Sequence, residues 1–179
     1  MAENNNIKIM KNWRLLLALI VTASTVGQEK TTTIYLIRHA EKADGSADPE
    51  LSDAGKERTK KWGAYFEKKN ITLYYTSLFK RSKLTATFTA AYFSQIPPPG
   101  TSKEMKFIAY DPANFSLKQA AKDNEGQNIV VVGHSNTIPA QINALLGKNV
   151  YPDIKEDEYG NLYIITITGD KITHELVKM

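Results

Sequence analysis

Residues 129–146 read IVVVGHSNTIPAQINALL, and this stretch decides the fold class. The apolar, β-branched run 129–132 predicts a strand that is buried on both faces, as in a parallel sheet. The polar turn that follows leads into an apolar helix over 138–146, with Asn136 or Thr137 as its N-cap and Gly147 as its stop. A buried strand that runs into a helix is the repeating unit of an α/β fold.

The same alternation extends to both sides of this stretch. The residue pattern predicts strands at 33–37, 71–75 and 105–109, and helices at 52–68, 81–93 and 116–121. Ser52 is the predicted N-cap of the first helix. Three successive prolines and a glycine predict a loop over 95–101. Two further strands, 162–168 and 171–177, flank Gly169-Asp170, which is a hairpin signal. We therefore predict a three-layer α/β/α domain with a mostly parallel sheet and a C-terminal β-hairpin.

Composition and charge exclude several classes of protein. The 179 residues are 42% hydrophobic and 23% charged, as in an ordinary globular domain. The chain has no Cys, which excludes disulfides and thiolate metal sites. Residues 1–27 hold three of the 23 basic and one of the 19 acidic side chains, so the net charge of +4 falls to +2 without them. That charge is too small for a nucleic-acid surface.

The N-terminal residues have the pattern of a secretory signal. Lys11 and Arg14 precede an apolar run over 15–23, and small residues follow it. The run is shorter than the about 20 residues that a transmembrane helix needs. We predict a signal peptide over 1–27, with Met10 as an alternative start. An uncleaved anchor and a core strand are the alternatives. Residues 28–179 would then form a periplasmic or secreted domain with no stable membrane span. No pattern predicts its oligomeric state.

Polar residues follow three of the predicted strands, at the edge where open α/β sheets place their sites. Arg38 and His39 follow the first strand, Arg81 follows the second, and His134 follows 129–132. The planar fork of Arg matches phosphate oxygens, and a neutral imidazole can attack phosphorus. A helix N-terminus after His134 also favours an anion. The sequence therefore predicts a phosphate site at this edge.

Other interpretations of these residues carry less weight. His39 alone could be a structural histidine, but three partners of matching chemistry follow the same strand ends. Glu41 with the two histidines could suggest a metal site, yet Arg38 would repel a cation. We expect Glu41 to be a structural partner of its loop rather than a metal ligand. His174 lies outside every motif, so we expect a surface or packing role for it.

Four segments resemble the motifs of one known family. Residues 37–41 (IRHAE) resemble the Arg-His-Gly signature of the histidine phosphatase superfamily, which includes the phosphoglycerate mutases. Residues 51–55 (LSDAG) resemble its Leu-Thr-x-x-Gly helix start, and 76–86 (TSLFKRSKLTA) its Ser-x-x-x-Arg-x-x-x-Thr-Ala segment. Residues 132–134 (VGH) resemble its second histidine motif. The motifs occur in the family's order between 34 and 146.

The resemblance implies a phosphoglycerate mutase-like fold and a role for each matching residue. His39 would be the nucleophile, and Arg38, Arg81 and His134 would bind the phosphate. The implied enzyme is a phosphatase without a metal or organic cofactor, and it hydrolyses phosphate monoesters of small molecules through a phosphohistidine. A mutase-type phosphotransferase is an alternative, although the short segment between Arg81 and His134 leaves little material for a lid. A non-catalytic phosphate-binding domain is another, although it would be expected to lose His39 first.

The chain departs from the family pattern at the proton donor. Ala40 replaces the usual Gly, which is a mild change, and Ser135 stands where some members carry an Asp. Asp111 is then the first candidate for the donor and Glu104 the second, while Asp111-Pro112 is also an ordinary turn pair. The small phosphohistidine phosphatases of the family, which this chain resembles in size, lack the usual acid. Export favours phosphorylated envelope sugars, nucleotides or scavenged phosphate esters as substrates.

Overall fold

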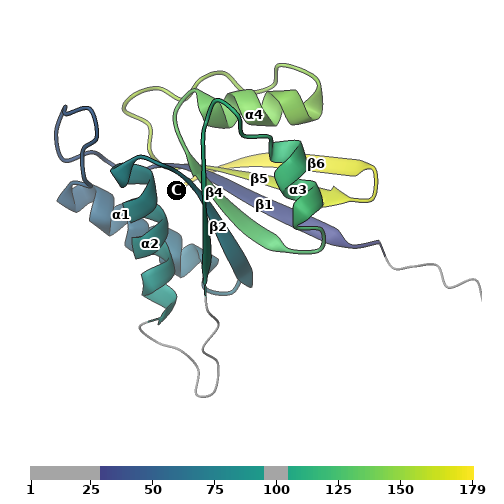
Figure 1. The fold of residues 1–179 in the computed structure, drawn as a ribbon, viewed down its shortest axis with the longest axis horizontal. Coiled ribbons are helices and arrows are strands. Elements are labelled where there is room, and N and C mark those ends of the chain that lie inside the picture. The colour runs from purple at the N-terminus through teal and green to yellow at the C-terminus, as the bar shows by residue number, and fades with distance from the viewer. Residues whose placement is uncertain (1–28, 95–104) are drawn as a thin grey trace, which may run out of the picture.

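The fold is a six-stranded sheet with helices on both faces (Figure 1). The computed structural model describes residues 29–94 and 105–179. The strands lie in the order β3-β2-β4-β1-β5-β6. They are β1 (Thr31–Arg38), β2 (Ile71–Ser77), β3 (Lys106–Tyr110), β4 (Asn128–Gly133), β5 (Asn161–Thr168) and β6 (Lys171–Lys178). The helices are α1 (Asp53–Phe66), α2 (Lys80–Ser94), α3 (Leu117–Asp123) and α4 (Thr137–Leu146).

The sheet is parallel over its first four strands and antiparallel at the other edge. Strand β4 pairs in parallel with β1 and β2, and β2 pairs in parallel with β3. Strands β5 and β6 form the C-terminal hairpin, which joins β1 in antiparallel register. Gly169 makes the hairpin turn with a φ of 55°, a conformation that glycine adopts without steric cost. The predicted fold class is therefore confirmed.

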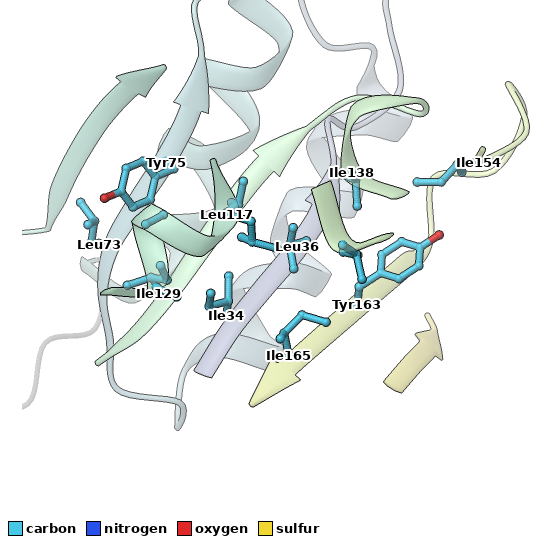
Figure 2. Packing of buried hydrophobic residues seen from close by; sticks show 14 residues of the cluster. Ile34, Leu36, Leu73, Tyr75, Leu117, Ile129, Ile138, Ile154, Tyr163 and Ile165 are labelled. Carbon is cyan, nitrogen blue, oxygen red and sulfur yellow. The ribbon is translucent and has the colours of Figure 1, made fainter. Parts of the chain in front are cut away.

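Two apolar clusters hold the three layers together. On one face, Trp62 and Phe66 of α1 and Ala86 of α2 pack on the sheet around Tyr74 and Val130. On the other face, Leu117 of α3 and Ile138 of α4 pack on Ile34 and Leu36 (Figure 2). Alternate residues of β1 and β4 feed the two clusters, as the two-residue period of a strand requires. Full burial of one such side chain contributes roughly 1.5–3 kcal/mol, so the central strands anchor the fold.

The helix ends follow the predicted chemistry. The Ser52 hydroxyl accepts a hydrogen bond from the backbone N–H of Gly55 at 3.1 Å and caps α1. Gly147 ends α4 with a φ of 66°. Asn136 takes the N-cap position of α4 without a side-chain bond, and the Thr137 hydroxyl accepts from the backbone N–H of His134 at 3.2 Å. That bond ties the start of α4 to a predicted site residue.

Some boundaries differ from those predicted, and some predictions lie outside the described residues. Helix α1 ends at Phe66 rather than at 68, and residues 67–70 form a turn in which Asn70 has a φ of 50°. The signal peptide over 1–27, the loop over 95–101 and Glu104 lie outside the described part. Within the described part, no helix has the length and apolar character to cross a membrane. His174 of β6 packs against Tyr151, and their side chains hydrogen-bond at 2.8 Å.

Candidate functional site

The strand register brings the two predicted histidines together. Arg38, the last residue of β1, pairs with Gly133, the last residue of β4. The residue after each strand is a histidine, His39 after β1 and His134 after β4, and their ring centroids lie 5.4 Å apart. The backbone N–H of His39 donates to the Gly133 carbonyl at 2.9 Å, which extends the pairing by one step. The site therefore follows from the parallel pairing of two buried strands.

A cavity of about 360 Å³ opens at this edge of the sheet. Four predicted site residues, Arg38, His39, Arg81 and His134, line it. Three basic side chains and the first turn of α4 surround it, so the wall suits an anion. The remaining lining residues are Lys42, Phe79, Pro112, Ser135, Asn136, Thr137 and Glu156.

The imidazole of His39 is held in one tautomer. Its Nδ1 lies 2.8 Å from the Ala40 carbonyl, which can only accept, so Nδ1 carries the hydrogen. Burial, with smaller contributions from His134, Arg38 and Arg81, lowers the pKa of His39 to about 3, although the bond to Ala40 acts in the opposite direction. The ring is therefore neutral near pH 7, with a lone pair on Nε2. This is the form of histidine that can attack phosphorus.

A hydrogen-bond chain holds the turn after His39 against α2. The backbone N–H of Ala40 donates to the Thr85 hydroxyl at 2.9 Å, and that hydroxyl donates to the Arg81 carbonyl at 2.7 Å. Ala40 is fully buried in this contact. Thr85, which lies in the same 76–86 segment as Arg81, thus connects the backbone next to His39 with the backbone of Arg81.

Arg38 is clamped by the loop between α4 and β5. Its Nη1 donates to the carbonyls of Lys155, Glu156 and Glu158 at 2.8–3.1 Å, and its Nη2 donates to the Glu156 carboxylate at 2.9 Å. The Tyr159 ring lies 4.3 Å from the guanidinium carbon. Only 1% of Arg38 is exposed, yet its Nε has no partner within the described residues. A buried donor without a partner costs free energy unless a ligand takes it.

Arg81 is placed by the first turn of α2. Its guanidinium lies over the Phe79 ring at 4.2 Å, and its Nη1 lies 3.9 Å from the Asp48 carboxylate. Its Nε is buried and, among the residues that the structure describes, unpartnered. Each of the two arginines that line the cavity therefore has one Nε donor that is available to a ligand.

Two buried serines orient the ring of His134 through a chain of hydrogen bonds. Its Nε2 lies 2.9 Å from the Ser77 hydroxyl, which donates to the Ser82 hydroxyl at 2.8 Å. Both serines are fully buried. Burial first, and then the nearby charges of Arg81 and Arg38, lower the pKa of His134 to about 4. The second histidine is therefore also neutral when the site is empty.

Glu41 and Asp111 are engaged away from the cavity. Arg58 donates to both carboxylate oxygens of Glu41 at 2.6–2.9 Å, as expected for a structural partner of the loop. Asp111 accepts from the backbone N–H of Ala113 at 3.0 Å and from the Asn114 amide at 2.8 Å. These bonds are those of a turn, and Asp111 does not line the cavity, although Pro112 does. Its role as proton donor stays a prediction.

Glu156 is a cavity residue that the sequence reasoning missed. Its carboxylate bonds to Arg38 and accepts from the Ser135 hydroxyl at 3.1 Å. No motif surrounds it, and it follows α4 in a loop of charged and polar residues. Only the folding of that loop over Arg38 brings it to the site.

Part of the chain matches the sequence model of a known family. Residues 34–111 match the sequence model of the histidine phosphatase superfamily (branch 1). The matched part contains Arg38, His39 and Arg81, and His134 lies beyond its end. Among curated proteins, no sequence matches this chain significantly.

Solved structures share the fold at low sequence identity. The protein histidine phosphatase SixA complexed with tungstate is 13% identical, with 82% of this chain and 96% of that chain covered and a TM-score of 0.59. Phosphoserine phosphatase from Entamoeba histolytica is 15% identical over 80% and 94% of the two chains, with a TM-score of 0.56. Mycobacterial glucosyl-3-phosphoglycerate phosphatase is 12% identical over 83% and 98%, with a TM-score of 0.54. These likenesses establish the fold and leave the chemistry to the site.

Proposed function

We propose that this chain is a histidine phosphatase that hydrolyses phosphate monoesters through a phosphohistidine on His39. One observation carries the proposal. The Nδ1–H of His39 is bound to the Ala40 carbonyl, so the lone pair of Nε2 is left for attack in a cavity lined by two arginines. The match of residues 34–111 to the superfamily and the phosphatases among the structures of like fold support it.

The proposed cycle has two steps. The ester phosphate binds to the unpartnered Nε donors of Arg38 and Arg81. His39 Nε2 then attacks phosphorus, the bond from phosphorus to the ester oxygen breaks, and that oxygen takes a proton from a general acid and leaves as an alcohol. The water of the next step returns this proton to the acid. A water molecule attacks the phosphohistidine, the P–N bond breaks, and inorganic phosphate leaves. Guanidinium groups stabilise the charge on the equatorial oxygens in both transition states.

The first experiment traps the intermediate. Wild-type protein quenched during turnover of a ³²P-labelled ester should carry acid-labile, alkali-stable phosphate. His39→Ala should lose both the label and the turnover, because it removes the proposed nucleophilic nitrogen. His174→Ala is the matched control, since this histidine packs against Tyr151 outside the cavity, and it should keep both. Substantial turnover by His39→Ala would contradict the assignment of the nucleophile.

The same proposal includes export of the enzyme from the cytoplasm. The basic, apolar and small-residue order of 11–27 supports export, which would give the enzyme small phosphorylated molecules outside the cytoplasm as substrates. N-terminal sequencing of the protein from each cell fraction tests this. A chain that starts near Gln28 outside the cytosol is expected, and an intact N-terminus in the cytosol would contradict export.

A further inference from the structure

The carboxylate of Glu156 lies where the reaction needs a group that can carry a proton. Among residues 29–94 and 105–179, Glu156 is the only acidic residue that lines the cavity. Its Oε2 accepts from Arg38 Nη2 at 2.9 Å, and its Oε1 accepts from the Ser135 hydroxyl at 3.1 Å. The side chain is 76% exposed, so it can move without disturbing the core.

Other carboxylates near this edge of the sheet are engaged elsewhere. Glu41 accepts hydrogen bonds from Nε and Nη2 of Arg58. Asp48 accepts from the backbone N–H of Lys80 at 2.8 Å, at the start of α2. Asp111 is bound within its own turn. Glu156 combines a place on the cavity wall with the freedom to turn toward a bound ester.

We propose that Glu156 is the acid–base residue of this site, which rests on the proposed phosphatase function. As His39 Nε2 bonds to phosphorus, the protonated Glu156 gives its proton to the departing ester oxygen, which leaves as an alcohol. Water then attacks the phosphohistidine, and the Glu156 carboxylate takes one of its protons. The P–N bond breaks, inorganic phosphate leaves, and both His39 and the protonated Glu156 are regenerated.

The charges around Glu156 explain how it becomes an acid only when substrate is bound. In the empty site Arg38, first, and the Ser135 hydroxyl hold the pKa of Glu156 below its usual value, and Lys42 acts in the same direction. A phosphate dianion bound to Nε and Nη2 of Arg38 would displace the Glu156 carboxylate from Nη2. It would also place negative charge beside that carboxylate. Both changes favour protonation. Of the other groups that line the cavity, the two histidines are neutral and Arg81 is cationic.

The test compares two substrates in two variants. Glu156→Gln keeps the shape and the bonding ability of the side chain but cannot transfer a proton. General acid catalysis contributes typically 10²–10⁴-fold, so kcat/KM for an alkyl phosphate should fall by about 100-fold or more. An aryl phosphate such as p-nitrophenyl phosphate has a better leaving group, and its kcat/KM should fall much less. Inhibition by inorganic phosphate should not weaken, because the variant removes a negative charge from beside the bound anion.

Glu158→Gln is the matched control. Glu158 lies in the same loop, but its carboxylate accepts from Asn161 and Lys178 instead of reaching the cavity. This variant should leave the ratio of alkyl to aryl rates unchanged.

Several results would overturn the assignment. An equal loss on both esters would mean that Glu156 acts only through Arg38, and no loss on either would remove it from the reaction. A selective loss in Asp111→Asn with none in Glu156→Gln would move the role to Asp111. A wild type that hydrolyses aryl but not alkyl esters would lack a donor altogether. Absence of a phosphohistidine in the labelling experiment would instead refute the underlying phosphatase function.

Discussion

At the scale of the residue, the site is defined by donors that are buried and have no partner. Arg38 and Arg81 come from different motifs. The Nε of each is buried and has no hydrogen-bond partner among the described residues. Two neutral histidines stand beside them. Such an arrangement is unfavourable in an empty domain and favourable once an oxyanion accepts the hydrogen bonds. It is the kind of local cost that marks a ligand site.

Removal of one arginine should therefore weaken oxyanion binding. Loss of a charge-assisted hydrogen bond costs on the order of 1.5–3 kcal/mol, so Arg81→Ala should raise the Kd for tungstate or phosphate by roughly 10- to 150-fold. Titration calorimetry measures this directly. Lys83→Ala removes the same charge from an exposed position of α2 and should change the Kd little. Equal effects of the two variants would show that only net charge matters.

At the scale of the element, two contacts between loops and secondary structure hold the site in shape. The loop between α4 and β5 closes over Arg38 with three backbone carbonyls and the Tyr159 ring. The start of α1 lies against the backbone of Glu41, which follows His39 by two residues. A Cβ atom on Gly55 would overlap the Glu41 carbonyl oxygen. Gly55 is therefore required for the close approach rather than for a special φ.

The Gly55 contact yields a prediction for the element. Gly55→Ala should push α1 away from the loop, lower stability by about 1–3 kcal/mol and lower kcat as well. Gly45→Ala is the control, because a Cβ there would meet no atom within 4 Å, and it should change stability by less than about 0.5 kcal/mol. Urea unfolding and ester hydrolysis measure the two effects. A stable and active Gly55→Ala variant would show that the loop yields without consequence.

At the scale of the whole molecule, burial of two neutral histidines links stability to pH. The pKa values of His39 and His134 fall from about 6.5 in the unfolded chain to about 3 and about 4 in the fold. Between these values the unfolded chain binds more protons than the folded one. The contribution to stability is therefore complete above about pH 6.5 and is lost as the pH falls toward the folded pKa values.

Urea unfolding at several pH values tests this linkage. The variant His39→Gln removes one of the two histidine titrations. Between pH 7 and 4.5 its free energy of unfolding should therefore fall by about 2 kcal/mol less than that of the wild type. His174→Gln changes a histidine outside the cavity and should follow the wild type more closely. Parallel pH profiles for wild type and His39→Gln would mean that His39 is not buried as a neutral ring.

The order of elements and four cavity residues could be predicted from local sequence. The runs 33–37 and 129–132 are apolar on both faces and become the central strands β1 and β4, because burial on both sides leaves no polar position. Residues that directly follow parallel strands must meet at one edge, so adjacency in sequence predicts that His39 and His134 lie together. The cap of α1 and the stop of α4 depend only on neighbouring residues and were predicted for the same reason.

The tertiary structure decided what depends on contacts between distant segments. Glu156 reaches Arg38 only because the loop before β5 folds back over the end of β1, and no periodicity records a bond between residues so far apart in the chain. The neutral state of both histidines likewise depends on neighbours supplied by other elements, whereas the bonds of Asp111 lie within its own turn. Local pattern determines strands, helices and the edge at which motifs gather, whereas burial and long-range pairing determine which charged groups remain available for chemistry.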